Sequence, residues 1–427
     1  MVKRALGNWV TGDNFWDREA ELDLFIEYLS AGANLLLTAP RRIGKTSLMH
    51  EAAVRMGGEF ICLEVDLQKA HSPADAIVAL SVQTRPYLPI WDKTKKIFGE
   101  LAGGVLDHLD ALQVSELTVK LRSSVPVDDW QDQGDQLLDV FAGAEKPVII
   151  FMDEVPILVN RILQGHDFTI TPEKRRSADA FMSWLRNNTL KHKGQIRFVV
   201  TGSIGFEPIL RLGGLNATLN TFTPFSLGPW NSPTALGFLA EISKSYEINL
   251  NELAATRMIN NLGYCIPHYV QMYFDLIYRT CKMRGTQDVT VEMVDEVYKT
   301  AMLSVQGHSE MSHLEERLRM VLGPTLFDYA LELLTEVAIT GRLTERQVAI
   351  LAEGYDFGGR SRADVAREVL GILEHDLYIA PNANGEYSPV SKYVTDWWRA
   401  RFEFGYIPAD KRKVHSAHAA EIQPRLQ

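Results

Sequence analysis

The sequence predicts an α/β protein in which a parallel sheet is followed by helices. Two observations predict the sheet. A loop of small and basic residues at 38–47 lies between the apolar run 35–37 and a stretch of good helix formers. A second apolar run, at 147–152, ends in two carboxylates and is typical of a strand buried on both faces. After Trp230 the pattern changes to helices alone, which indicates a separate helical part.

The loop at 38–47 has the pattern of a phosphate-binding loop at the start of a helix. In such a loop backbone N–H groups surround the β-phosphate, and the helix N-terminus adds partial positive charge. Lys45 would reach the β- and γ-phosphate oxygens, Thr46 would ligate Mg²⁺, and Gly44 would let the backbone approach the phosphates. The expected nucleotide contacts are Ala39, Pro40, Arg41, Arg42, Ile43, Gly44, Lys45, Thr46 and Ser47.

The loop departs from the usual GxxxxGK[ST] pattern at one position. Ala39 stands where that pattern has its first glycine. A chance Gly-Lys-Thr at a helix start is therefore the alternative interpretation of the loop.

The acidic end of the second apolar run supplies the other half of the predicted site. Ligands of parallel sheets collect at the carboxyl ends of the strands. Asp153 would hold Mg²⁺ directly or through water, and Glu154 would polarise the water that attacks the γ-phosphate. The alternative is a strand followed by an acidic turn, and the loop upstream in the same chain weighs against it.

Composition sets broader bounds. The chain has 427 residues, enough for about two to four domains. No run approaches the roughly twenty apolar residues that span a bilayer, and the first residues lack the apolar core of a signal peptide, so we expect a cytoplasmic protein without membrane contact. The net charge of −10 disfavours a protein coated in nucleic acid, although a local basic patch could bind it. Cys62, Cys265 and Cys281 form neither a disulfide framework nor a zinc pattern, and we expect buried thiols.

The remaining elements of the first half follow from periodicity. A helix with apolar residues on one face ends at Gly32, and further helices are expected at 45–56 and 177–190. Strands are expected from residue 34, at 60–66, 147–152 and 195–203, and within 220–227. The region between the strand at 60–66 and residue 144 is expected to be mostly helical, with an extended piece at 117–121. Thr201 or Ser203 is available to hydrogen-bond the γ-phosphate, although the strand could simply end there in turn residues.

The second half is read as two helical modules. Ser232 caps a helix with Pro233 at its first position, and helices at 251–262, 267–283 and 290–303 complete a bundle. Helices at 326–339, from Thr344 to 351 and from Ser361 precede a hairpin around residues 381–384, an order typical of a winged helix. Its third helix alternates in charge and its wing lacks a cation, so a protein or intramolecular contact is favoured and DNA stays an alternative.

Four motifs together carry a resemblance. They are Phe15-Trp16-Asp17-Arg18-Glu19-Ala20-Glu21-Leu22, Pro40-Arg41-Arg42-Ile43-Gly44-Lys45-Thr46-Ser47-Leu48, Met152-Asp153-Glu154 and Thr201-Gly202-Ser203. Over roughly the first three hundred residues the chain resembles the archaeal-type P-loop ATPases, close to the STAND and AAA+ groups.

The resemblance implies a fold and a set of further contacts. It implies a five-stranded parallel core of the additional-strand type, a helical lid, and a switch between ADP and ATP states that often works through oligomers. Residues 10–15, including Phe15, would lie over the adenine. Pro267 and His268 match the lid motif that approaches the phosphates, and the alternative is an interhelical turn with a surface histidine. The expected parts are 1–228 (ATPase core), 229–306 (lid), 307–408 (winged helix) and 409–427 (tail).

Two functional classes remain open. The first is an ATPase that binds ATP and Mg²⁺, self-associates, and engages DNA or a protein through its winged helix. The second is a regulatory module in which ATP orders the lid without turnover. Arginines that could stabilise transition-state charge, from within the chain or across an oligomer, are Arg186, Arg197 and Arg211. The acidic pair at the end of the second run favours the ATPase.

Overall fold

The computed structural model describes residues 3–5, 9–99, 110, 112–125, 129–202 and 205–412. Its contacts divide the chain into two compact units. The first is Met1–Ser245 with Ile266–Gln271, and the second is Tyr246–Cys265 with Met272–Gln427. The expected divisions at residues 228 and 306 stay a prediction. No helix in the described ranges has the length and apolar composition to cross a membrane.

A five-stranded parallel sheet forms the centre of the first unit, as the sequence predicts. The strand order is β2-β3-β4-β1-β5. The strands are β1 (Leu35–Thr38), β2 (Ile61–Asp66), β3 (Val148–Asp153), β4 (Ile196–Gly202) and β5 (Thr223–Ser226). Every residue of β4 is buried, in keeping with its near-continuous apolar sequence. The strand β4 lies between β1 and β3, which is the additional strand that the resemblance implies.

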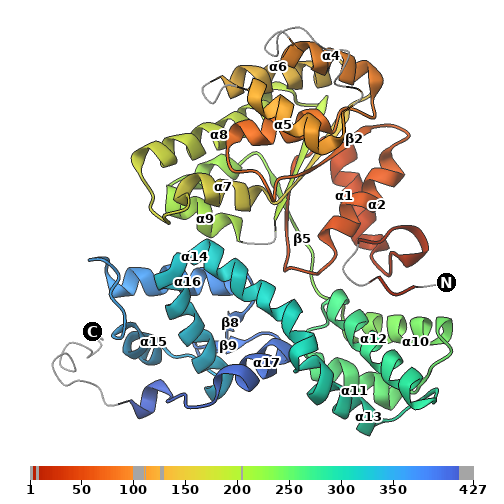
Figure 1. The fold of residues 1–427 in the computed structure, drawn as a ribbon, viewed down its shortest axis with the longest axis vertical. Coiled ribbons are helices and arrows are strands. Elements are labelled where there is room, and N and C mark those ends of the chain that lie inside the picture. Colours follow the sequence, from red (N-terminus) through yellow and green to blue (C-terminus); the bar gives the residue numbers. More distant parts are fainter. Residues whose placement is uncertain are drawn as a thin grey trace. The chain divides into compact units, whose positions relative to one another are not determined.

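Helices cover both faces of this sheet (Figure 1). The connection from β1 to β2 crosses the sheet toward its β2 edge, whereas the connections from β2 to β3, β3 to β4 and β4 to β5 run in the opposite direction. Because crossovers between parallel strands are right-handed, the first connection lies on one face of the sheet and the later connections lie on the other. One side carries α1 (Glu19–Ser30) and α2 (Lys45–Met56), and the 3₁₀ turn η1 (Gly12–Asn14) precedes α1. The other connections hold α3 (Pro73–Val82), α4 (Leu88–Gly99), α5 (Val114–Ser124), α6 (Trp130–Ala142), α7 (Val155–Gln164), α8 (Pro172–Lys191), α9 (Phe206–Gly213) and η3 (Asn216–Leu219).

The extended piece expected at 117–121 is wrong, because these residues lie in α5. Leu117 and Leu121 are both buried and stand four residues apart, which places them on one helical face. A reciprocal cap between Gln113 and Glu116 starts the helix, a signal that the sequence reasoning passed over.

The helices after the sheet begin at α10 (Ser232–Ser245), which belongs to the first unit. Its cap is Asn231 rather than Ser232, because the Asn231 Oδ1 accepts a 2.9 Å hydrogen bond from the Thr234 backbone N–H. The bundle then holds α11 (Glu252–Leu262), α12 (Pro267–Arg284), α13 (Val291–Val297) and the π-helical turn η4 (Tyr298–Met302). This part is not purely helical as expected, since β6 (Asn249–Leu250) and β7 (Asp288–Val289) form a short parallel pair.

The C-terminal part has the predicted order of helices followed by a hairpin. Its first element, α14 (Val305–Thr340), consists of two helical segments that meet at Gly323, whose φ of 69° and ψ of 174° are not helical. The other elements are α15 (Glu345–Ala352), α16 (Arg362–His375), the antiparallel pair β8 (Ile379–Pro381) and β9 (Tyr387–Pro389), α17 (Lys392–Phe402) and η5 (Ala409–Lys411). The predicted cap at Thr344 is confirmed, since its Oγ1 accepts from the Gln347 N–H at 3.2 Å. The winged-helix interpretation stays a prediction, and the expected tail lies mostly outside the described residues.

One buried carboxylate organises the core of this part. Glu336 on α14 accepts hydrogen bonds from Gln347 Nε2 at 2.8 Å, from the Tyr406 hydroxyl at 2.8 Å and from the Ala409 backbone N–H at 3.0 Å. Buried charge is tolerated where several donors satisfy it. Glu336 therefore holds α14, α15 and the segment before η5 together. Among the cysteines, Cys265 and Cys281 are buried as expected, and Cys62 is partly exposed.

Candidate functional site

The loop that is predicted to bind phosphates gets its shape from two left-handed residues. Gly44, the N-cap of α2, has φ 104° and ψ 21°, and Arg42 has φ 66°. Glycine adopts this region without the steric cost of a Cβ. Ala39 is not among the residues with positive φ, so its replacement of the usual glycine causes no backbone strain here. The departure from the usual pattern is therefore compatible with the turn.

Lys45 points back into this loop. Its Nζ donates to the carbonyl oxygens of Ala39 at 2.8 Å and Pro40 at 3.0 Å, and the residue is only 7% exposed. The loop thus concentrates positive charge next to the N-terminus of α2, where an anion is favoured.

The expected metal ligands lie next to each other. The Thr46 hydroxyl donates to Asp153 Oδ2 at 3.4 Å. Burial, followed by the neighbouring charge of Glu154, raises the pKa of Asp153 to about 6. The sheet register also pairs Asp66 at the end of β2 with Asp153, and its charge raises the same pKa. Asp66 was not among the predicted site residues, although it is the acidic last residue of an expected strand.

Glu154 stands at a sharp turn between β3 and α7. It has φ 62° and ψ 30°, is buried, and its backbone N–H donates to Asp153 Oδ1 at 2.9 Å. A left-handed non-glycine residue is uncommon and costs free energy that the surroundings must offset. Its charge also acts on Arg161 of α7, whose pKa is lowered by burial and which donates to the Ala70 carbonyl at 3.0 Å. Sequence reasoning missed Arg161, since nothing in its helical pattern distinguishes it.

Thr201 has a fully buried hydroxyl that finds no hydrogen-bond partner among the residues that the structure describes. The register sets Thr201 opposite Leu37 on β1, and it sets the preceding Val200 opposite Met152 on β3. Thr201 therefore lies level with Asp153 at the carboxyl edge of the sheet. A buried hydroxyl without a partner costs about 1–3 kcal/mol and calls for an explanation. The other predicted sensor, Ser203, lies outside the described residues.

The segment before α1 lies along α2 and contacts two of its buried residues. The Val10 N–H donates to Ser47 Oγ at 3.1 Å, and the Gly12 N–H donates to Glu51 Oε2 at 2.8 Å. Phe15, at the end of this segment, is buried. These bonds bring residues 10–15 beside the phosphate-binding helix, the neighbourhood in which the adenine contact of Phe15 is predicted.

Pro267 and His268 begin α12, and the turn around them groups with the first unit. A hydrogen bond from the Ala5 N–H to Gln271 Oε1, at 3.1 Å, joins this turn to the N-terminal segment. His268 is buried, which disagrees with the surface histidine of the alternative interpretation. Its approach to the phosphates stays a prediction.

The three arginine candidates differ in environment. Arg211 on α9 is 70% exposed and pairs with Glu207 at 3.0 Å. The Arg186 Nε of α8 donates to Asn220 Oδ1 at 2.8 Å. Arg197 is buried near the amino end of β4 and donates to the Leu29 carbonyl at 2.6 Å, so it lies at the wrong end of the strand for the site. Its interpretation as a charge sensor is therefore wrong.

The side chains at the carboxyl edge suit a nucleotide with Mg²⁺. A hydroxyl and a carboxylate oxygen in contact are hard ligands of the kind that Mg²⁺ prefers. Within the described ranges the buried Thr201 hydroxyl lacks the partner that a phosphate oxygen would supply. Thr46 and Asp153 would hold the metal ion, and the loop would hold the phosphates.

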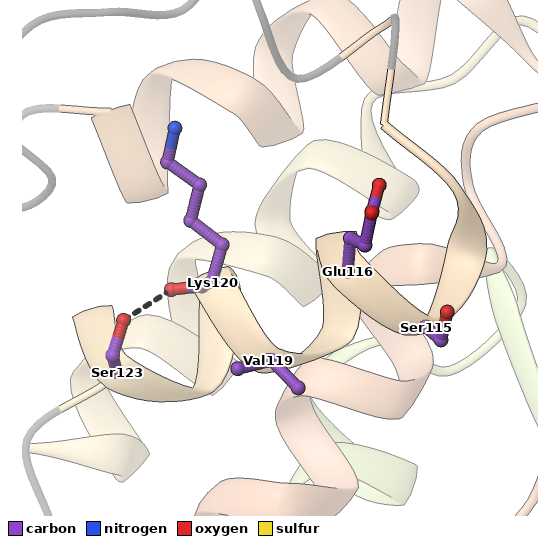
Figure 2. A pocket seen from close by; sticks show the side chains of 5 residues that line it. All are labelled: Ser115, Glu116, Val119, Lys120 and Ser123. Atoms are coloured by element: carbon purple, nitrogen blue, oxygen red, sulfur yellow. Dashed lines mark hydrogen bonds between the residues drawn. The ribbon is translucent and has the colours of Figure 1, made fainter.

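A separate hollow lies against α5, and Figure 2 shows its lining. All five lining residues belong to that one helix: Ser115, Glu116, Val119, Lys120 and Ser123. The dashed contact in the view is local, from Ser123 Oγ to the Lys120 carbonyl. Because its lining comes from a single helix, this hollow is not a candidate for catalytic chemistry.

The strand order, the phosphate-binding loop and the acidic strand end define the fold of a P-loop ATPase of the additional-strand type. The structure is similar to the Walker-type ATPase PABY2304 of Pyrococcus abyssi, with a TM-score of 0.58 and 16% identity over 92% of this chain and 99% of that chain. It is also similar to the ORC2 protein of Aeropyrum pernix in its ADPNP–ADP complexes, with a TM-score of 0.50 and 13% identity over 92% of this chain and 98% of that one. No family model and no curated protein matches the sequence. The expected resemblance to archaeal P-loop ATPases is thus confirmed for the fold.

Proposed function

We propose that the protein binds and hydrolyses ATP with Mg²⁺ and uses its nucleotide state as a conformational switch. The observation that carries the proposal is the contact of Thr46 with Asp153 directly beside the loop that holds Lys45. The contact brings a hydroxyl and a carboxylate oxygen, which are ligands of the kind that Mg²⁺ prefers, to the helix N-terminus where phosphates are favoured. The ORC2 protein of Aeropyrum pernix, which shares this fold, was solved in ADPNP–ADP complexes, and this supports nucleotide binding by the present chain.

Each residue of the site has one role in ATP binding or hydrolysis. Loop N–H groups and Lys45 would hold the phosphates, and Thr46 with Asp153 would hold Mg²⁺, which would supply neutralising charge for the phosphates. Glu154 takes a proton from the attacking water, while Thr201 donates to the γ-phosphate oxygen through the hydroxyl that has no partner in the described part of the chain. The products are ADP and phosphate.

The test compares ATP turnover of the wild type with Lys45→Ala and Glu154→Gln. Glu154→Gln keeps the shape of the side chain and removes the base, so turnover should fall about 10²–10⁴-fold while calorimetry still detects ADP binding. Lys45→Ala should lose both ATP turnover and ADP binding. Unchanged turnover in Glu154→Gln would remove this residue as the base. ATP binding without any turnover would instead favour the regulatory module.

A protein partner is favoured over DNA for the predicted winged helix. Arg367 of α16 donates to Asp364 at 2.6 Å, and Arg360 pairs with Glu368. Because Asp364 and Glu368 stand beside these arginines, this face has little net positive charge for phosphate binding. The turnover assay is therefore repeated with double-stranded DNA over a range of salt concentrations, with light scattering to follow mass. Stimulation by DNA that fades with salt would reverse this preference.

A further inference from the structure

Arg18 is a buried arginine between the N-terminal segment and α1. It is 5% exposed and has three hydrogen-bond acceptors. Its Nη1 donates to Glu21 Oε1 at 2.9 Å, and its Nη2 donates to the carbonyl oxygens of Ile43 at 3.3 Å and Gly228 at 2.8 Å. Because an arginine stays charged, this burial is tolerated only through such partners.

The two carbonyl oxygens belong to parts of the protein with different roles. Ile43 is a fully buried residue of the phosphate-binding loop, next to Gly44. Gly228 follows β5 and leads into α10. One NH₂ group of the guanidinium therefore links the loop to the point where the chain leaves the sheet.

The residues on the N-terminal side of Arg18 hold α10 itself. Trp16 Nε1 donates to the Thr234 carbonyl at 3.4 Å. The Trp16 ring lies edge-on against the Phe238 ring, with 5.9 Å between the two ring centroids. The Thr234 hydroxyl donates to Asp17 Oδ2 at 2.6 Å. The short segment 16–18 thus contacts the loop through one side chain and the first two turns of α10 through the other two.

We propose that Arg18 is a positioning residue that couples the phosphate-binding loop to α10, so that loop movement on nucleotide binding reaches the helical region after the sheet. The inference rests on the proposed function. The bond to Ile43 is the longer of the two carbonyl bonds, and Ile43 belongs to the loop, so a movement of the loop around phosphates changes this bond. The shared Nη2 then carries the change to Gly228 and, through the neighbouring residues 16 and 17, to α10.

The experiment measures hydrogen–deuterium exchange in full-length protein with and without Mg·ADP. In the wild type, nucleotide should slow exchange about tenfold in the loop and in the first turns of α10. Arg18→Lys keeps the charge, but its ammonium nitrogen takes the position of the arginine Cζ, one bond short of the Nη2 that donates to both carbonyl oxygens. This variant should still bind Mg·ADP, and the nucleotide should still slow hydrogen exchange in the loop. It should no longer slow exchange in the first turns of α10.

Kinetics separate coupling from general damage. Arg18→Lys should lower kcat about tenfold and leave KM for ATP within about threefold, because the phosphate contacts themselves remain. The matched control is Arg85→Lys, since Arg85 also donates to two carbonyl oxygens, those of Asp110 and Leu112, far along the chain from the loop. This control should leave both the exchange response and kcat unchanged.

A second variant avoids the buried charge altogether. Thr234→Val removes the hydroxyl that binds Asp17 and leaves the Arg18 bonds intact. It should reduce the α10 response in the same way. If α10 still responds to nucleotide in Arg18→Lys and Thr234→Val, the coupling proposal is overturned while the proposed function stands. If the wild type binds no nucleotide, the proposed function fails and the coupling fails with it.

Discussion

Thr201 buries a hydroxyl that has no partner among the described residues, and this makes its replacement informative. Thr201→Val keeps the shape and removes the hydroxyl. We expect the free energy of unfolding of the nucleotide-free protein to rise by about 1 kcal/mol, because an unpartnered polar group no longer has to be buried. Turnover should fall about 10²-fold through loss of a donor to the phosphate.

Stability from urea unfolding and turnover from phosphate release together check this prediction. Thr201→Ser serves as the control, since it keeps the hydroxyl and should keep most of the turnover. A Thr201→Val protein that is less stable and equally active would show that the hydroxyl has a structural partner and no catalytic role.

Asp153 makes the stability of the metal-free protein depend on pH. Its pKa is raised from the ordinary aspartate value of 3.8 to about 6 in the folded protein. Between these two values the folded state binds more protons than the unfolded state, so the free energy of unfolding falls as pH rises through this window. A shift of about two units corresponds to about 3 kcal/mol.

Thermal unfolding in EDTA between pH 4 and pH 8 measures this effect. Asp153→Asn has no charge to desolvate, so it should be more stable than the wild type at pH 8 by about 1–3 kcal/mol, and the difference should vanish near pH 4. A difference between the two proteins that does not change with pH would contradict the raised pKa.

At the scale of elements, Gly202 sets the distance between β4 and α7. A Cβ built at Gly202 would lie 2.5 Å from Pro156, near the start of α7, so a side chain there must push the helix away. Because Glu154 begins this helix, Gly202→Ala should cost about 1–3 kcal/mol of stability and reduce turnover as well.

The double variant Gly202→Ala with Pro156→Ala tests the steric origin. Removing the proline ring should restore part of the stability in urea unfolding, which is a coupling that independent sites do not show. The matched control is Gly371→Ala in α16, where no described neighbour lies within 4 Å of the added Cβ and stability should rise by about 0.5–1 kcal/mol. Additive losses in the double variant would refute the contact.

The elements with strong local signals could be predicted from the sequence. The helix α2 was expected at 45–56 and forms Lys45–Met56, because a glycine turn and an unbroken helical pattern bound it. The central strands β3 and β4 are predictable because burial on both faces leaves continuous apolar runs. The cap at Asn231 was missed by one residue, since Asn and Ser are equally good caps and only the hydrogen bond distinguishes them.

Site residues that depend on distant partners could not be predicted in the same way. Asp66 joins the site only through the register of β2 with β3. Arg18 belongs to the first of the four sequence motifs, but its acceptors Ile43 and Gly228 come from distant parts of the chain. The environment of the Thr201 hydroxyl depends on every neighbour of its strand. Sequence patterns report local periodicity, whereas these properties arise from packing between elements.

At the scale of the whole molecule, the last prediction concerns copies of the chain that complete each other's sites. Arg211 follows the strand of Thr201, is 70% exposed and pairs at 3.0 Å with Glu207, a neighbour on its own helix. An exposed pair of this kind contributes little stability, so Arg211 can exchange this partner for one on another copy. Arg186 is held to Asn220 within its own unit and is the weaker candidate.

If Arg211 acts across an interface, Arg211→Ala and Glu154→Gln should each be nearly inactive, and their mixture should recover activity. An intact site then needs Glu154 from one copy and Arg211 from the next, and random head-to-tail mixing gives this pairing in about a quarter of interfaces. The measurement is phosphate release from the mixture across protein concentrations, with Arg186→Ala as the comparison that should keep most of its turnover. Recovery that grows with concentration requires contact between copies, because neither variant has a complete site alone. If the mixture stays as inactive as its components, Arg211 does not act across an interface. The arginine charge then comes from the same chain, or hydrolysis does not need it.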